Sequence, residues 1–145
     1  MPRLSTRAIR AEASIKETRA AALSIGRELE IFTGGSDGEI DSAFRSMAQK
    51  RVESLLVLPD YFFSTRRVQL VIQAARHGVP AMYYDRAHAE AGGLMSYGTN
   101  NADVYRQAGV YVGRILKGEK PANMPVLQPT KFELVINMPG RLCWR

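Results

Sequence analysis

The chain has 145 residues, of which 46% are hydrophobic and 23% are charged, a composition typical of one ordinary globular domain. Its net charge of +6 lies at its ends, because residues 1–27 carry a net +4, residues 141–145 carry a net +2 and residues 28–140 are balanced. A nucleic-acid-binding domain needs a basic stripe on its folded surface, so we expect no nucleic-acid partner. No stretch approaches 18 continuous apolar residues, and the first residues lack the apolar core of a secretory signal peptide.

The amino-terminal third of the chain predicts a helix, a strand and a second helix. Apolar residues recur near helical spacing from about Arg7 to Gly26, and a short strand is predicted over residues 29–32. Ser36, followed three residues later by Glu39, is a capping-box pattern. A helix is therefore predicted to begin there and to continue to about residue 51. Its apolar face is formed by Ile40, Phe44 and Met47.

The middle of the chain predicts a buried strand, a helix and two further strands. Residues 54–58, SLLVL, are continuously apolar and end at Pro59, as expected of a strand buried on both faces of a parallel sheet. A helix is predicted from about Ser64 to Gly78, where glycine and a following proline end it. Residues 81–84 and 94–97 are predicted to be the next two strands.

The last third predicts one long helix and a final strand. Asn100 or Asn101 is expected to cap the helix, and Gly118 ends it. Its apolar side is formed by Tyr105, Ala108, Val112, Ile115 and Leu116. The final strand covers residues 132–136. Strands that alternate with helices through short loops predict an α/β fold, with a mainly parallel sheet between helices on both faces in three layers.

Polar and aromatic side chains follow three of the predicted strands. Ligands of open parallel α/β sheets bind outside the carboxyl ends of the strands, so these positions are candidates for ligand contact. A carboxylate among aromatic residues suits a small-molecule pocket, which needs an apolar lining and a few oriented polar groups. The candidate ligand-binding residues are Asp60, Tyr61, Phe62, Asp85, Arg86, Ser96 and Tyr97.

Each candidate also has a structural interpretation. Asp60 could cap the helix that follows it, with the neighbouring aromatic rings in the core. Asp85 and Arg86 could pair with neighbours on the surface. The hydroxyls of Ser96 and Tyr97 could bond to the backbone instead of to a ligand.

Motifs for catalysis and cofactor binding are missing from the sequence. It contains no G-x-S-x-G nucleophile elbow, no P-loop and no G-x-G-x-x-G loop, so we predict neither an enzyme nor a cofactor. His77 is expected at a helix end and His88 in a solvated loop, and their neighbours match no metal-ligand spacing. The single cysteine, Cys143, excludes a disulfide within the chain and is expected to be a free thiol.

Four phrases of the sequence carry a family resemblance. They are IDSAF at 40–44, LLVLPD at 55–60, AARHGVPAMY at 74–83, and the run from Gly92 to Pro121 that continues into VLQPTKFELVIN at 126–137. In this order they resemble the substrate-binding proteins of ABC-type uptake systems, in the branch that includes tryptophan- and tyrosine-type transport binders. The resemblance covers about residues 15–137.

The resemblance implies a fold like that of periplasmic binding proteins, in which two α/β lobes close over a solute. By this likeness residues 1–100 are the second lobe, with a hinge crossing near residues 94–97. Residues 101–128 hold a helix and a strand that belong with the first lobe, and residues 129–145 return to the second lobe and end in an atypical tail. A small amino-acid-like or related organic solute, an ABC permease as partner and a periplasmic location are implied as well.

The body of a first lobe is not found in this sequence, so we expect a truncated or frameshifted chain. As written, without a signal peptide, the chain would be cytoplasmic. The helix over 101–117 would then expose its apolar side and could form a homodimer. A non-catalytic sensory or regulatory ligand-binding domain is the alternative function. A phospho-receiver is disfavoured because Thr-Gly-Gly follows Phe32 where paired acidic residues are needed, and residues 3–14 are too short for a DNA-binding helix-turn-helix.

Overall fold

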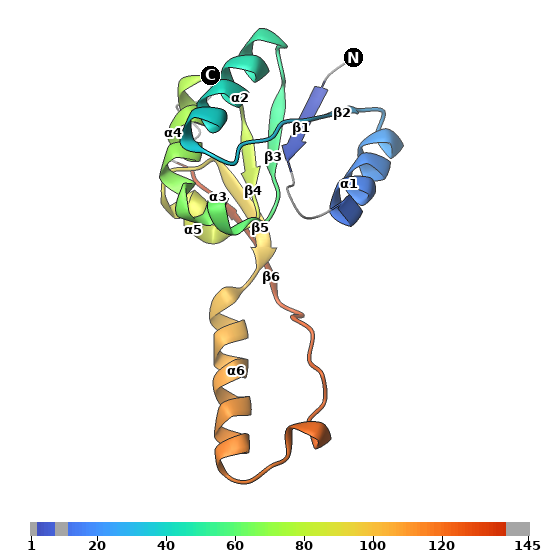
Figure 1. The fold of residues 1–145 in the computed structure, drawn as a ribbon, viewed down its shortest axis with the longest axis vertical. Coiled ribbons are helices and arrows are strands. Elements are labelled where there is room, and N and C mark those ends of the chain that lie inside the picture. The colour runs from blue at the N-terminus through green and yellow to red at the C-terminus, as the bar shows by residue number, and fades with distance from the viewer. Residues whose placement is uncertain (1–2, 8–11, 139–145) are drawn as a thin grey trace.

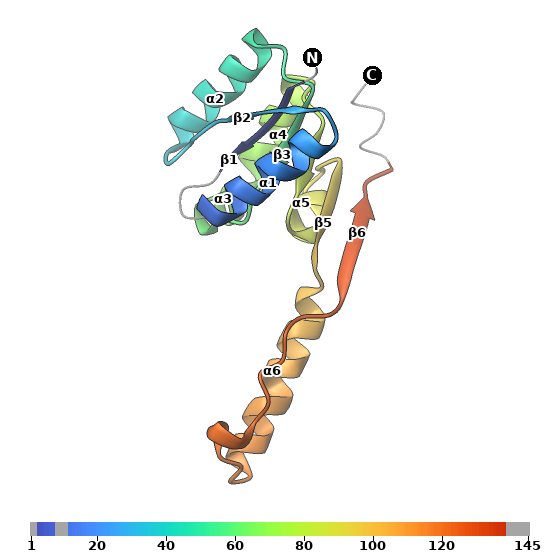
Figure 2. The ribbon, with the colours of Figure 1, turned by 90° about the vertical axis from the view of Figure 1, so that its right-hand side faces the viewer.

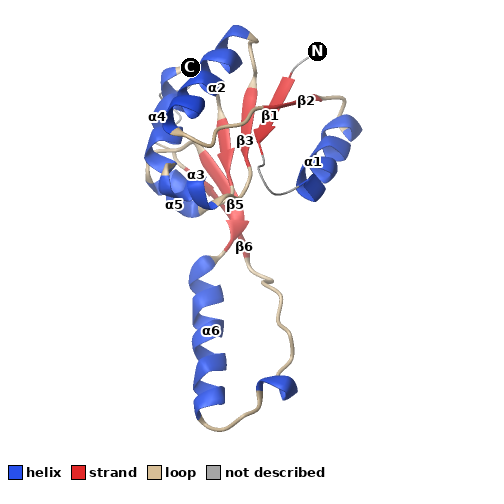
Figure 3. Cartoon of the chain, viewed as in Figure 1, coloured by secondary structure: helices blue, strands red, loops and turns tan. Residues whose placement is uncertain are grey.

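A computed structural model describes residues 3–7 and 12–138 of the chain. Helices and strands alternate along most of it, as Figure 3 shows. The elements are β1 (Arg3–Arg7), α1 (Glu12–Ser24), β2 (Glu28–Ile31), α2 (Asp37–Gln49), β3 (Ser54–Val57), α3 (Tyr61–Thr65), α4 (Arg67–Arg76), β4 (Ala81–Tyr83), α5 (Arg86–Glu90), β5 (Met95–Thr99), α6 (Asn101–Leu116), the 3-10 turn η1 (Pro121–Asn123) and β6 (Phe132–Ile136).

The strands form one sheet in the order β2-β1-β3-β4-β5-β6. All neighbouring pairs are parallel except β5 and β6, which are antiparallel. Helix α1 covers one face of the sheet near β1 and β2, whereas α2, α4 and α5 lie on the opposite face (Figure 1). The predicted α/β class, with a mainly parallel sheet between helices, is confirmed.

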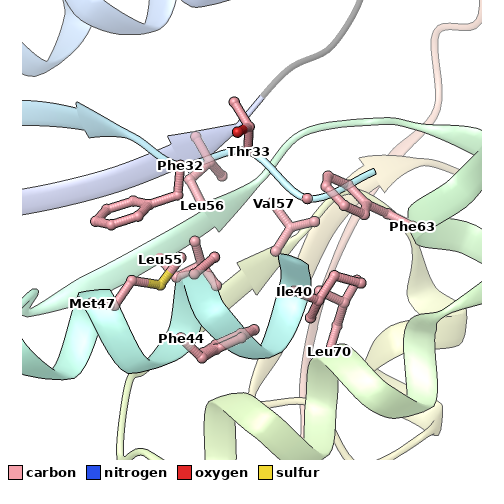
Figure 4. Close-up of a pocket in the computed structure, with 12 residues that line it drawn as sticks. Phe32, Thr33, Ile40, Phe44, Met47, Leu55, Leu56, Val57, Phe63 and Leu70 are labelled. Carbon is pink, nitrogen blue, oxygen red and sulfur yellow. The ribbon is translucent and has the colours of Figure 1, made fainter. Parts of the chain in front are cut away.

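The core lies between the sheet and the α2–α4 side. Helix α2 begins as predicted, because the Ser36 hydroxyl accepts a hydrogen bond from the Glu39 backbone N–H at 3.3 Å. The helix buries the predicted face of Ile40, Phe44 and Met47 against β3 and α4. A cavity of about 30 Å³ remains among these side chains (Figure 4). Its lining is almost wholly apolar and its size is close to that of one water molecule, so it is a packing gap in the core rather than a ligand site.

Helix α6 and the segment that returns from it form an arm outside the body of the domain (Figures 1 and 2). The two limbs touch along an apolar groove of about 440 Å³, and the Tyr111 hydroxyl donates to the Pro125 carbonyl at 2.6 Å. A different side of α6, which does not face the groove, carries an apolar stripe that is exposed to solvent, with Tyr105 at 77%, Val112 at 55% and Leu116 at 82%. These three lie at helical spacing on one side, so the apolar side predicted for this helix is exposed to solvent.

The base of the arm is held by charges. Lys131 and Arg106 donate to the carboxylate of Asp103 at 2.7 and 2.9 Å, which holds the pKa of that carboxyl well below its usual range. Asn100 caps α6, because its side chain accepts from the Asp103 backbone N–H at 2.9 Å. These contacts fix α6 to the segment that enters β6.

Three expectations about secondary structure were wrong. The first helix begins at Glu12 and not near Arg7, because residues 3–7 form β1 between β2 and β3, while residues 8–11 lie outside the described part. Residues 125–131 contain no strand, and Val126 is 94% exposed, because the arm offers no neighbouring strand for hydrogen bonds. His88 lies on α5 with 1% of its side chain exposed and is not in a solvated loop.

Candidate functional site

A pocket of about 510 Å³ lies at the carboxyl ends of β3, β4 and β5, where the parallel fold predicts a ligand site. Its apolar floor comes from the strand ends, and its polar rim comes from the turns that follow them. The residues that matter most below are Tyr83, Tyr84, Asp85, Tyr97, Asn101 and Phe132.

Asp85 is the carboxylate of this pocket. One of its oxygens accepts from the Ala87 backbone N–H at 2.7 Å and caps α5. The other accepts from the Asn101 side-chain amide at 2.7 Å, at the first residue of α6. Asp85 therefore links the pocket to the arm, and none of the described residues that line the pocket beside it is a lysine or an arginine. The negative charge favours a ligand that carries a cationic or hydrogen-bond-donating group.

Tyr97 and Phe132 form an aromatic wall of the pocket. They come from the paired strands β5 and β6, and their rings stack with centroids 6.1 Å apart at 20°. Both side chains remain more than half exposed. An exposed aromatic pair beside a carboxylate can cover a flat ring of a ligand and bind a polar group at the same time.

The hydroxyl of Tyr84 is held in place by two hydrogen bonds. Its hydroxyl donates to the Asp60 carbonyl at 3.0 Å and shares a 2.6 Å hydrogen bond with the Ser64 hydroxyl. Burial raises the pKa of Tyr84, so this hydroxyl stays protonated at neutral pH and keeps its donor role. Gly98 runs so close to Tyr84 that a Cβ there would lie 1.9 Å from the Tyr84 carbonyl oxygen. Only glycine fits at this place in β5.

The structure brings two of the seven sequence candidates, Asp85 and Tyr97, into the pocket. Asp60 caps α3 through a 2.8 Å hydrogen bond from the Phe62 backbone N–H, and Tyr61 is 85% exposed beside it. Phe62 packs partly against the core.

Arg86 and Ser96 lie away from the lining. Arg86 is on the surface, where it pairs with Glu90 at 2.7 Å and with Glu133 at 3.4 Å. Ser96 is 1% exposed. It points to the same face of the sheet as the buried Tyr83, with which it pairs in register.

The pocket also uses residues that the sequence reasoning did not select. Asn101 was considered only as a helix cap, and Phe132 only as the start of a strand. Phe132 enters the site because β6 returns antiparallel to β5, a pairing between segments more than 30 residues apart. Tyr83 and Tyr84 carried a usable signal, since they end the strand predicted over residues 81–84, directly before Asp85.

Within the described ranges, no group of three or more histidine, cysteine, aspartate or glutamate side chains is placed to hold a metal ion. The same ranges contain no helix with both the length and the apolar character needed to cross a lipid bilayer.

The family model for ABC transporter substrate-binding proteins matches residues 5–140. Three solved structures share the fold. An ABC domain in complex with L-Trp from Streptococcus pneumoniae is 25% identical, with a TM-score of 0.83 over 97% of this chain and 50% of that one. A conserved domain protein from Vibrio cholerae is 22% identical, with a TM-score of 0.80 over 95% of this chain and 48% of that one. The ligand-free, open form of a substrate-binding protein with adhesive properties from Clostridium difficile is 16% identical, with a TM-score of 0.71 over 99% of this chain and 50% of that one.

No curated protein matches the chain. The chain spans about half the length of the solved structures that it resembles. Because the family model covers most of its residues, the chain belongs to the ABC transporter substrate-binding protein family.

Proposed function

We propose that this chain is a solute-binding part of an ABC-type uptake system and that it binds its solute in the pocket at the carboxyl ends of β3, β4 and β5. The observation that carries the proposal is the joint placement of Asp85 and the Tyr97–Phe132 stack in a space of about 510 Å³. The pocket lies where ligands bind in open parallel α/β sheets. Membership of a substrate-binding family supports the same role.

The solute that fits this chemistry is a small amino-acid-like molecule with a flat ring. Its ammonium group would pair with Asp85, and its ring would lie against Tyr97 and Phe132. The structural relative from Streptococcus pneumoniae, which was solved with L-Trp, supports this class. L-tryptophan and L-tyrosine are therefore the first probes to use.

The remaining roles of the chain follow from the same proposal. Residues 1–100 and 129–145 would belong to one lobe, and residues 101–128 would reach toward another. The exposed stripe of Tyr105, Val112 and Leu116 is the surface that would contact such a lobe or, without one, the same stripe of a second copy. A permease would be the membrane partner, the location would be periplasmic, and the role would be non-catalytic. A sensory or regulatory binding domain, the alternative, would use the same pocket without a permease.

Titration calorimetry with L-tryptophan tests the proposal on the 145-residue chain. A ligand of about 15 non-hydrogen atoms at about −0.3 kcal/mol per atom would bind with about −4.5 kcal/mol, a Kd near 0.5 mM. Asp85→Asn should weaken binding about tenfold, because it removes the charge that faces the ammonium group. Asparagine remains a good helix cap, so the fold should be kept.

Asp60→Asn is the matched control. Asp60 caps α3 by the same kind of hydrogen bond as Asp85 uses on α5, but it does not line the pocket. We expect Asp60→Asn to bind like the wild-type chain. Equal losses in both variants would mean that the effect comes from helix capping, and no heat with either amino acid would reject the proposed solute class.

A further inference from the structure

His88 lies directly behind the pocket, between two of the residues that line it. Its ring stacks on Tyr83 with centroids 4.8 Å apart at 14°, and it meets Tyr84 edge-on at 5.1 Å and 61°. Tyr83 and Tyr84 both border the pocket, Tyr83 with a fully buried side chain and Tyr84 with a partly buried one, whereas His88 is 1% exposed and does not border it. The imidazole is therefore a support for the tyrosine side of the pocket.

The backbone closes tightly over this stack. The Gly93 N–H donates to the His88 carbonyl at 2.9 Å. A Cβ on Gly93 would lie 2.7 Å from that carbonyl oxygen and 2.8 Å from the Tyr83 ring. The chain at Gly93 therefore packs closely against both the His88 backbone and the Tyr83 ring, which fixes the two residues relative to each other.

The surroundings of His88 suit a neutral ring. Neither of its ring nitrogens makes a hydrogen bond of ordinary geometry within the described residues. Burial lowers the pKa of His88, and Arg67 on α4 adds to this. Asp85 acts in the other direction and raises the pKa of His88 through its negative charge and its backbone carbonyl. The Phe63 carbonyl on α3 raises it as well. At the end of β4 and directly after it, the hydroxyls of Tyr83 and Tyr84 stay uncharged, because burial raises the pKa of each.

We propose that His88 is a positioning residue for the ligand pocket, whose neutral ring holds Tyr83 and Tyr84 in place and whose protonation releases them on acidification. An imidazolium in this place would be a buried charge, and its loss of hydration outweighs the support that Asp85 and the Phe63 carbonyl give it. It would recover its hydration by leaving the stack for water, and the two tyrosines would then lose their support. The expected change in ligand affinity rests on the proposed function, whereas the expected change in the packing of the tyrosines does not.

The pH dependence has a defined sign. A histidine whose pKa is lowered in the folded state stabilises that state above the unfolded pKa of about 6.5, and the stabilisation is lost as the pH falls through the folded pKa. The tyrosine side of the pocket should therefore be formed near pH 8 and be lost as the pH falls through the lowered pKa of His88, below about 6.5. If binding requires neutral His88, the apparent Kd should rise by at most about tenfold at about pH 5.5.

The test compares His88→Phe, His88→Ala and His77→Phe with the wild-type chain. Phenylalanine keeps a flat ring that cannot titrate, and alanine removes the ring. His77 is the matched control, because it stacks on Phe44 with centroids 6.1 Å apart and is not part of the pocket. Near-ultraviolet circular dichroism follows the tyrosines, far-ultraviolet dichroism follows the fold, and proton NMR follows both histidine rings.

We expect the tyrosine signal of the wild-type chain to be lost reversibly below about pH 6.5 while the far-ultraviolet spectrum is kept. His77→Phe should behave in the same way, His88→Phe should lack the transition, and His88→Ala should lack the signal at every pH. An acid transition that persists in His88→Phe would overturn the inference. So would a His88 NMR titration above about 6.5, because the ring would then be stabilised as a cation.

Binding of L-tryptophan is measured in parallel. Loss of the pH dependence of Kd in His88→Phe but not in His77→Phe supports the inference. If the wild-type chain binds neither L-tryptophan nor L-tyrosine, the proposed solute class fails. The dichroism and NMR results still decide the role of His88.

Discussion

Removing the hydroxyl of Tyr83 is expected to stabilise the protein, whereas the same change at the next residue is expected to destabilise it. The Tyr83 side chain is fully buried, and its hydroxyl has no hydrogen-bond partner among the described residues. Such a group costs about 1–3 kcal/mol, part of which is balanced by the contacts that its oxygen makes. Tyr83→Phe should therefore raise the free energy of unfolding by about 1 kcal/mol.

Tyr84 provides the internal comparison. Its hydroxyl makes two hydrogen bonds, with Ser64 at 2.6 Å and with the Asp60 carbonyl at 3.0 Å. Each contributes about 1 kcal/mol, so Tyr84→Phe should lower the free energy of unfolding by about 1–2 kcal/mol. The two variants should differ by about 2–3 kcal/mol, which for a chain of this size is roughly 6–10 °C in Tm.

Urea unfolding followed by far-ultraviolet circular dichroism measures both variants under the same conditions. The reasoning predicts unfolding midpoints on opposite sides of the wild-type midpoint, with an unchanged m-value. Equal destabilisation in both variants would refute it, because the Tyr83 hydroxyl would then have a partner, such as a buried water, that its surroundings do not indicate.

Four further variants test the core, β5 and the arm. Phe44→Ala should lower the free energy of unfolding by about 3–5 kcal/mol, measured by urea unfolding, since Phe44 is 1% exposed at the centre of the core. Gly98→Ala should unfold or strongly destabilise the chain, because its Cβ would meet the Tyr84 carbonyl. Gly109→Ala in α6 meets no atom within 4 Å and should stabilise the helix by about 0.5–1 kcal/mol; thermal melting distinguishes the two. The proposed contact between copies through the exposed stripe of α6 predicts that Leu116→Lys reduces self-association in size-exclusion chromatography with light scattering. A monomeric wild-type chain, or an unchanged mass distribution in the variant, would exclude this contact.

Most of the fold could be predicted from the sequence where local patterns agree with packing. The capping box at Ser36 and the apolar run of β3 each specify one element, and both are confirmed. Strand β1 could not be predicted, because RLSTR contains a single apolar residue and its place in the sheet depends on pairing with β2 and β3. Only those long-range hydrogen bonds make it a strand.

The site could be predicted in position but only partly in composition. The rule that ligands bind at strand ends led to Asp85, which directly follows the strand predicted over 81–84, and to Tyr97, which ends the strand predicted over 94–97. The five-residue helix α5 is too short to show a helical period, so the inward turn of His88 could not be seen in the sequence. Phe132 depends on the antiparallel return of β6, which no local pattern indicates.

The most direct test of the proposed binding site is a residue-resolved NMR titration of the chain with L-tryptophan. We expect the largest shifts of backbone amides at residues 56–58, 82–85 and 97–99 and at Asn101 and Phe132, which line the pocket at the ends of β3, β4 and β5. Shifts confined to the groove between α6 and residues 121–129, or no shifts at millimolar tryptophan, would contradict the claim that this pocket binds the solute.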